Sequence, residues 1–152
     1  MSTVVDVAAY ILDHYGSMTT MKLQKLAFYS QAHCLVNRGR CLFKEDFQAW
    51  VNGPVSPDLY RRHRGKFLIH AGELAGVPRS DSKLSPHETE EVDAACSRLA
   101  PLTGNQLSIM THQEDPWRLA RKGYGPSDYC DVLITKESIR TFYSSHPTWE
   151  FF

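Results

Sequence analysis

The sequence predicts a mainly α-helical protein, a single compact domain of six or seven helices with at most a short two- or three-stranded β element. Apolar residues recur at helical spacing in several segments, and Ser or Thr precedes most of these segments as a helix cap. No internal repeat, low-complexity tract or linker divides the chain. A chain of 152 residues fits one domain, which buries about 70% of its unfolded surface.

The first predicted helix covers residues 3–15. Thr3 and Asp6 have the spacing of a capping box, and Gly16 follows the last periodic residue, where a helix commonly ends. Between them the apolar residues form one stripe: Val4, Val7, Ala8, Ile11 and Leu12.

The longest predicted helix covers residues 21–38, with Thr20 as its cap and Gly39 near its end. Its apolar residues spread over more than one face, so we expect wide coverage by other elements. Its polar residues allow two interpretations: a solvated face, which is the simpler, or hydrogen bonds from the glutamines to a neighbouring segment. The polar residues concerned are Lys22, Gln24, Lys25 and Gln31, with the Tyr29 hydroxyl among them.

Residues 47–60, F-Q-A-W-V-N-G-P-V-S-P-D-L-Y, turn the chain around an aromatic residue. Phe47 and Ala49 alternate with Gln48 and Trp50, which predicts a short strand or an extended arm. We expect Trp50 to be a buried anchor. A turn at residues 52–54 then leads to Ser56, which caps a helix that begins with Pro and runs to about residue 64.

The remaining chain alternates loops and short helices. Residues 65–84 form the loosest part, a candidate mobile or partner-facing loop with a short apolar run at 67–69; it contains Gly72, Gly76, Pro78 and a Ser/Asp cluster at 80–82. Further helices are expected from Ser85 to about residue 100, after a Thr103 cap, over 117–123 after a Thr111 cap, and after a Thr135 cap. We expect a core at about 4–143 and a tail at 144–152 that docks on the body or on another chain.

Composition favours a cytoplasmic protein. Basic and acidic residues both number 17, so overall charge gives no reason to expect nucleic acid or an anionic membrane as partner. The N-terminus lacks a basic region, and no apolar run approaches the ~20 residues of a membrane span. The four cysteines form no C-x-x-C pair, which indicates free thiols in a reducing compartment.

The sequence predicts no catalytic residue, metal or cofactor. Phosphate-loop, dinucleotide, zinc and G-x-S-x-G motifs are absent. The aromatic corners favour a recognition module, a domain that acts by binding another protein. Two alternatives to this interpretation stay open. His112 with Asp115 and Trp117 forms either the site of a small enzyme or ligand-binding protein, or merely a helix corner. The basic run from Arg61 to Lys66 either contacts nucleic acid, the weaker alternative, or interacts with a helix dipole.

Four stretches together resemble a known family. They are M-K-L-Q-K-L-A-F-Y-S-Q-A-H-C-L at 21–35, the segment 42–64 with A-W-V-N-G-P-V, L-S-I-M-T-H-Q-E-D-P-W-R-L-A-R at 107–121, and I-T-K-E-S-I-R-T-F-Y at 134–143. Their order is similar to that of the Panacea, or SocA-like, antitoxin domain, which also occurs in phage-associated proteins of the GepA type. Asn52 and Ser56 depart from the family pattern and make the corner more polar.

The resemblance implies a non-enzymatic, helical antitoxin that neutralises a cognate toxin, encoded next door, by direct protein contact. It also implies a possible proteolytic adaptor that delivers the toxin to a ClpXP-type protease. The residues carried over as partner-binding or family-signature positions are Lys22, Gln24, Lys25, Tyr29, Gln31, Trp50, Gly53, Pro54, Val55, Tyr60, Thr111, His112, Pro116 and Trp117.

Overall fold

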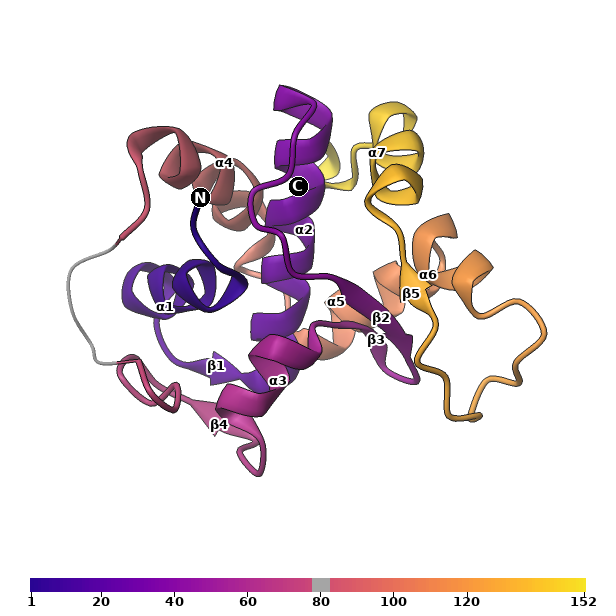
Figure 1. The fold of residues 1–152 in the computed structure, drawn as a ribbon, viewed down its shortest axis with the longest axis horizontal. Coiled ribbons are helices and arrows are strands. Elements are labelled where there is room, and N and C mark those ends of the chain that lie inside the picture. Colours follow the sequence, from indigo (N-terminus) through magenta and orange to yellow (C-terminus); the bar gives the residue numbers. More distant parts are fainter. Residues whose placement is uncertain (78–82) are drawn as a thin grey trace.

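The computed structural model describes residues 1–77 and 83–152 and confirms the mainly α-helical class (Figure 1). Within these ranges the helices are α1 (Val4–Tyr15), α2 (Thr20–Arg38), α3 (Pro57–His63), α4 (Pro86–Leu99), α5 (Gly104–His112), α6 (Asp115–Ala120) and α7 (Lys136–Ser145), followed by a 3₁₀ turn, η1 (Thr148–Phe151). The short strands are β1 (Met18–Thr19), β2 (Phe47–Trp50), β3 (Gly53–Val55), β4 (Leu68–Ile69) and β5 (Leu133–Ile134).

The strands form two small antiparallel sheets. One pairs β1 with β4, and the other has the order β3-β2-β5. In the second sheet Trp50 lies opposite Gly53, and Phe47 lies opposite Ile134. The sheet therefore brings the chain after α6 back to the hairpin β2–β3.

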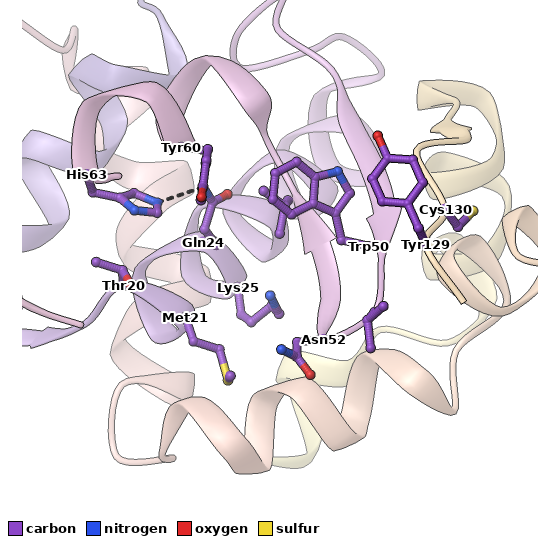
Figure 2. Close-up of a pocket in the computed structure, with 12 residues that line it drawn as sticks. Thr20, Met21, Gln24, Lys25, Trp50, Asn52, Tyr60, His63, Tyr129 and Cys130 are labelled. Atoms are coloured by element: carbon purple, nitrogen blue, oxygen red, sulfur yellow. Dashed lines mark hydrogen bonds between the residues drawn. The ribbon is translucent and has the colours of Figure 1, made fainter. Parts of the chain in front are cut away.

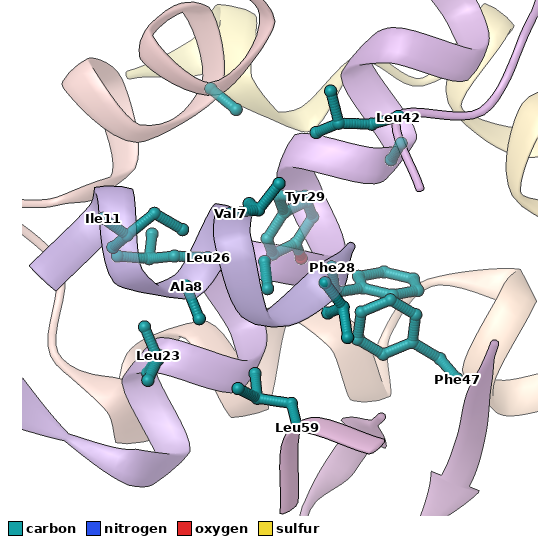
Figure 3. Packing of buried hydrophobic residues seen from close by; sticks show 14 of the residues in the cluster. Val7, Ala8, Ile11, Leu23, Leu26, Phe28, Tyr29, Leu42, Phe47 and Leu59 are labelled. Carbon is teal, nitrogen blue, oxygen red and sulfur yellow. The ribbon is translucent and has the colours of Figure 1, made fainter. Parts of the chain in front are cut away.

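Helix α2 is the centre of the domain, and α1, α4, α5, α7 and β3 pack around it (Figure 1). Because it is covered on most sides, its apolar residues face several neighbours. Leu23, Leu26 and Phe28 are fully buried with residues of α1 and with Phe47 of β2 (Figure 3). Phe28 and Phe47 meet edge to face at 5.2 Å between ring centroids. The hairpin is thus joined directly to the core.

Local capping signals locate most helix starts. Capping boxes at Thr3, Ser85 and Thr103 form as predicted, and Thr135 caps α7. The cap of α2 is Thr19, one residue before the predicted Thr20.

The predicted cap at Thr111 is wrong. Thr111 lies inside α5, and its hydroxyl donates to the Ser108 carbonyl at 2.7 Å, the backward bond of a helical Thr. Helix α6 begins instead after Glu114, whose side chain makes no capping bond.

The solvated face predicted for α2 is also wrong for three of its polar residues. Gln24, Lys25 and Gln31 are 1–2% exposed. Gln31 accepts a hydrogen bond from the Leu42 N–H at 2.6 Å and donates to the Phe43 carbonyl at 2.8 Å. The alternative interpretation, in which glutamines bond a neighbouring segment, is therefore confirmed. An amide side chain both donates and accepts hydrogen bonds. It can therefore bond a buried backbone N–H and C=O in the way that a neighbouring strand would.

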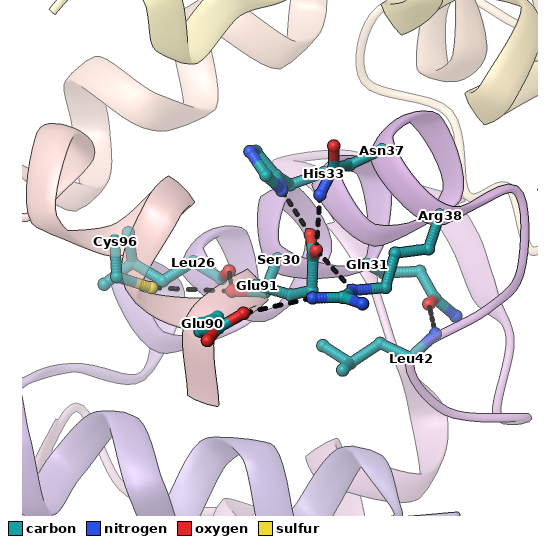
Figure 4. A network of polar contacts seen from close by, with 10 residues as sticks. All are labelled: Leu26, Ser30, Gln31, His33, Asn37, Arg38, Leu42, Glu90, Glu91 and Cys96. Carbon is teal, nitrogen blue, oxygen red and sulfur yellow. Dashed lines mark hydrogen bonds and ion pairs between the residues drawn. The ribbon is translucent and has the colours of Figure 1, made fainter. Parts of the chain in front are cut away.

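A second polar group joins α2 to α4. Glu91 of α4 is 1% exposed and accepts hydrogen bonds from His33, Asn37 and Arg38 of α2 (Figure 4). These bonds hold the pKa of Glu91 below its usual value although burial acts in the opposite direction. The end of α2 is thus fixed to α4 by a satisfied buried charge.

The C-terminal tail docks on the body of the protein. Trp149 is 5% exposed, and Thr148 donates to the buried Glu114 carboxylate. The same carboxylate accepts hydrogen bonds from Tyr29 of α2 and Tyr143 of α7. Burial raises the pKa of Glu114, and these donors oppose that rise.

Of the loop predicted at 65–84, residues 65–77 and 83–84 are described, whereas Pro78 and the cluster at 80–82 lie outside the described residues. Leu74 is buried, and the Ala75 N–H donates to the Arg62 carbonyl, so the described part packs on α3. The predicted partner-facing role stays a prediction.

The four cysteines are free, as predicted. Burial raises the pKa of Cys34 to about 11 and that of Cys96 to about 12. No helix in the described part of the chain is long and apolar enough to cross a membrane.

Candidate functional site

The hairpin β2–β3 and helix α3 form a corner against the start of α2. Gly53 makes the turn possible, because its φ of +116° is a conformation that side chains rarely allow. A β-carbon at Gly53 would lie 2.6 Å from Cε of Lys25 and 2.8 Å from Oγ1 of Thr111. The hairpin backbone therefore contacts both α2 and α5 directly.

Gln24 joins this corner to α2. Its Oε1 accepts from the Ser56 N–H at 2.9 Å, and its Nε2 donates to the Ser56 carbonyl at 3.3 Å. The same Nε2 also donates to Nε2 of His63 at 3.0 Å. Burial and the nearby charge of Lys25 lower the pKa of His63, which suits an accepting, neutral ring.

Of the two residues that depart from the family pattern, Ser56 belongs to the fold. It is fully buried and caps α3 by accepting from the Leu59 N–H at 3.3 Å. Asn52 is exposed, and its carbonyl accepts a hydrogen bond from Ser108 of α5 at 2.5 Å. Only Asn52 therefore leaves its side chain at the surface.

Trp50 is half-buried, so the prediction of a buried anchor is wrong at this position. Its Nε1 donates to Gln48 on the same face of β2 at 2.8 Å, and its ring meets Tyr60 edge to face at 5.0 Å. The strand alternation explains this result, because Phe47 and Ala49 take the inward face and leave Trp50 on the other.

Trp117 is the buried anchor of the corner. It is 9% exposed, and its Nε1 donates to the Trp50 carbonyl at 2.7 Å. Arg121, which the sequence reasoning did not single out, lies over the same ring at 5.2 Å and donates to the Ala49 carbonyl at 2.9 Å. Arg121 is only 4% exposed, but a basic residue in a polar helix end gives no sequence signal of burial.

A cavity of about 400 Å³ opens between the start of α2, the hairpin and α3 (Figure 2). Most of its exposed wall is apolar, and Lys25 points its ammonium toward the space beside Trp50. Burial lowers the pKa of Lys25 to about 7. The lining residues are Thr20, Met21, Gln24, Lys25, Trp50, Val51, Asn52, Val55, Tyr60, His63, Tyr129 and Cys130.

His112 lies at the corner between α5 and α6. Its ring stacks on Trp117 at 4.0 Å with planes 13° apart, and burial lowers its pKa. Its Nε2 is buried and has no hydrogen-bond partner among the described residues. Asp115 instead pairs with Arg118 at 2.5 Å, so it does not orient the imidazole as a catalytic carboxylate would.

The basic run predicted as an alternative nucleic-acid contact is divided among several local roles. Arg61 pairs with Asp58, Arg62 donates to the Ala75 carbonyl at 2.7 Å, and His63 is buried beside Gln24. Arg64 and Lys66 are exposed. The run therefore presents fewer free cations than its sequence suggests.

The signature residues do not form one patch. Gln24, Lys25, Trp50, Val55 and Tyr60 line the cavity. The others lie around it or away from it: Gly53 and Pro54 are in the hairpin, Thr111, His112, Pro116 and Trp117 are in α5 and α6, Lys22 donates to the Ala100 carbonyl, and Tyr29 and Gln31 face the core. Which of them contact a partner stays a prediction.

A helical domain with an aromatic corner is typical of a recognition module. Within the described residues, no group of three His, Cys, Asp or Glu side chains could hold a metal ion. The fold and the corner define a small helical protein with half-buried aromatic side chains at its surface.

Comparison with known proteins identifies the family. The family described as "Antitoxin SocA-like, Panacea domain" matches residues 23–118, and the chain belongs to this family. "Antitoxin SocA" of Caulobacter vibrioides (strain NA1000 / CB15N) is 27% identical over 149 residues, with 84% of this chain and 78% of that protein covered. No solved structure matches. Membership supports an antitoxin role in a toxin–antitoxin system and implies a toxin partner.

Proposed function

We propose that this protein is a non-enzymatic antitoxin that neutralises a cognate toxin by direct binding at the hairpin corner. The observation that carries the choice of surface is the half-buried pair of Trp50 and Tyr60. Tyr129, which is 77% exposed, lines the same cavity as this pair. Arg61, also exposed, follows Tyr60 in α3. Trp, Tyr and Arg are the residue types enriched at binding hot spots.

The corner is also rigid enough to bind without large rearrangement. Gln24 fixes Ser56, and Trp117 and Arg121 hold the backbone of β2. A surface held in place before binding loses less conformational entropy in the complex. The place of action proposed is the cytoplasm, since free cysteines suit a reducing compartment.

Co-expression with the toxin encoded by the neighbouring gene tests the proposal. We expect the wild-type chain to restore growth and to co-purify with the toxin. The double variant Trp50→Ala/Tyr60→Ala should weaken both, while Phe151→Ala, which removes an exposed aromatic side chain from η1, should not. Circular dichroism must first establish that each variant is folded. Equal neutralisation by the corner variant and the wild type would reject this surface, and failure of the wild type would reject the antitoxin role.

The proteolytic-adaptor role is a finer form of the same proposal, and it rests on the family relationship. A simple blocker lengthens or leaves unchanged the lifetime of its bound toxin, whereas an adaptor shortens it. We expect purified ClpXP to degrade the toxin faster when this chain is present. An unchanged toxin half-life at saturating chain would leave inhibition by binding as the mechanism.

A further inference from the structure

Lys25 is a buried cation at the wall of the corner cavity. Its side chain is 1% exposed, and its Nζ donates to the Pro54 carbonyl at 3.2 Å. An ammonium group has three N–H donors. Among the described residues, the Pro54 carbonyl is the acceptor within hydrogen-bond distance of Nζ. No Asp or Glu side chain among the described residues forms an ion pair with the Lys25 ammonium. A buried charge of this kind is costly unless it is paired.

The cavity supplies no anion of its own. None of its lining residues is Asp or Glu, and Trp50, Val55 and Met21 provide apolar wall. The titratable residues that line the cavity with Lys25 are Tyr60 and His63 of α3 and Tyr129 and Cys130 before β5, and His112 of α5 lies close enough for the charge of Lys25 to lower its pKa. None of these residues carries a carboxyl group. The charge of Lys25 lowers the pKa of both histidines, so they do not compensate it.

We propose that this cavity binds a carboxylate group, with the Lys25 ammonium as its cation and the side chains of Trp50 and Tyr60 along its apolar body. A carboxylate, with one negative charge, matches a site with one buried cation and an apolar wall. The Asn52 amide at the rim can supply a further donor.

The carboxylate could belong to a free organic acid or to an acidic side chain of a partner protein, since both present the same group. The cavity and its charge belong to this chain alone, so the inference does not depend on the antitoxin role. Binding should take up a proton, because burial lowers the pKa of Lys25 to about 7 and a bound anion raises it.

Isothermal titration with phenylacetate and its neutral analogue phenylacetamide tests the site. We expect the acid to bind at least tenfold more tightly than the amide at pH 6.5, and its affinity to fall up to tenfold per pH unit above about pH 7. Lys25→Met should remove the preference for the acid, while Lys22→Met, a change on the same helix, should retain it. Equal binding of acid and amide by the wild type, or an unchanged preference in Lys25→Met, would overturn the proposal.

A second arm identifies the source of the carboxylate. The capped peptide acetyl-Ala-Leu-Glu-Leu-Ala-amide is compared with its Gln analogue in the same proteins. Lys25-dependent preference for the Glu peptide supports an acidic side chain of a partner, and preference for phenylacetate alone supports a free acid. No Lys25-dependent binding of either probe rejects the site. Loss of carboxylate binding in Lys25→Met with unchanged toxin neutralisation would support the site and separate it from the toxin interface.

Discussion

Gly53 lies so close to Lys25 that a β-carbon at Gly53 would stand 2.6 Å from Cε of that lysine. The contact explains two signature positions together, because the turn leaves no room for a side chain while a buried lysine occupies the other side. The two residues are 28 positions apart, so their dependence on each other becomes visible only in the folded chain.

Gly53→Ala should destabilise the protein more than Gly123→Ala. Both glycines have positive φ, +116° and +92°, but nothing lies within 4 Å of a β-carbon at Gly123. Alanine at either site pays the backbone cost, and only at Gly53 does it also displace buried atoms, which adds about 1–3 kcal/mol. Urea unfolding of the two variants measures the difference. Equal losses would show that Lys25 and Thr111 move aside freely.

Gln24→Ala should destabilise the fold by about 2–4 kcal/mol, because it leaves the buried N–H and carbonyl of Ser56 without their amide partner. The matched change is Gln113→Ala, at an exposed side chain, with an effect within about 0.5 kcal/mol. Chemical denaturation compares them. If both variants were equally stable, water would have replaced the amide of Gln24.

Trp117→Ala should lower the free energy of unfolding by about 3–5 kcal/mol, as truncation of a buried aromatic side chain does. Trp50→Ala should lower it by about 1–2 kcal/mol. Trp117 loses its bond to the Trp50 carbonyl and its contacts with His112 and Arg121, while Trp50 is already half in solvent. Guanidinium unfolding with a fluorescence-independent probe, such as far-ultraviolet circular dichroism, tests the order. The reverse order would contradict the assignment of Trp117 as the anchor.

Lys25→Met should stabilise the protein most at pH 7 and below. Burial lowers the pKa of Lys25 to about 7, so between about pH 7 and the unfolded value near 10.4 the unfolded chain binds more protons. The free energy of unfolding of the wild type therefore increases as the pH rises from about 7 to about 10.4. With about 1.4 kcal/mol per pKa unit, the advantage of the Met variant should shrink by on the order of 4 kcal/mol between pH 6 and 10. Urea unfolding across that range, with Lys122→Met as an exposed control, measures it. A constant difference would show that Lys25 keeps its charge when folded.

Local signals in the sequence predicted the helices well, because caps and apolar stripes act over a few residues. Thr3, Ser85 and Thr103 form the boxes that their spacing indicates. Thr111 failed as a cap because α5 continues past it, which depends on its packing beneath the hairpin. Local pattern alone could not distinguish the two cases.

The candidate site was less predictable, because burial depends on segments that meet only in the fold. Lys25 and Gln24 have the sequence appearance of a solvated face, yet strand β3 and the Ser56 that follows it cover them from about thirty residues away. Trp50 and Trp117 look alike in sequence, and only the pairing of β2 with β3 and β5 decides which is enclosed. The alternation of Gln48 with Trp50 was the available signal for the outward position.

The two glutamines of α2 also attach the hairpin segment to the helix at two points. Gln31 bonds the backbone at Leu42 and Phe43, and Gln24 bonds it at Ser56. Both ends of the segment between these points are therefore attached to the same helix. The two anchors are seven residues apart, about 10.5 Å along the helix axis. The residues of this segment that face away from the core, such as Gln48, Trp50 and Asn52, can therefore change while both attachment points and the buried Phe47 and Ala49 stay in place. A domain built this way can acquire a new binding surface without rebuilding its core.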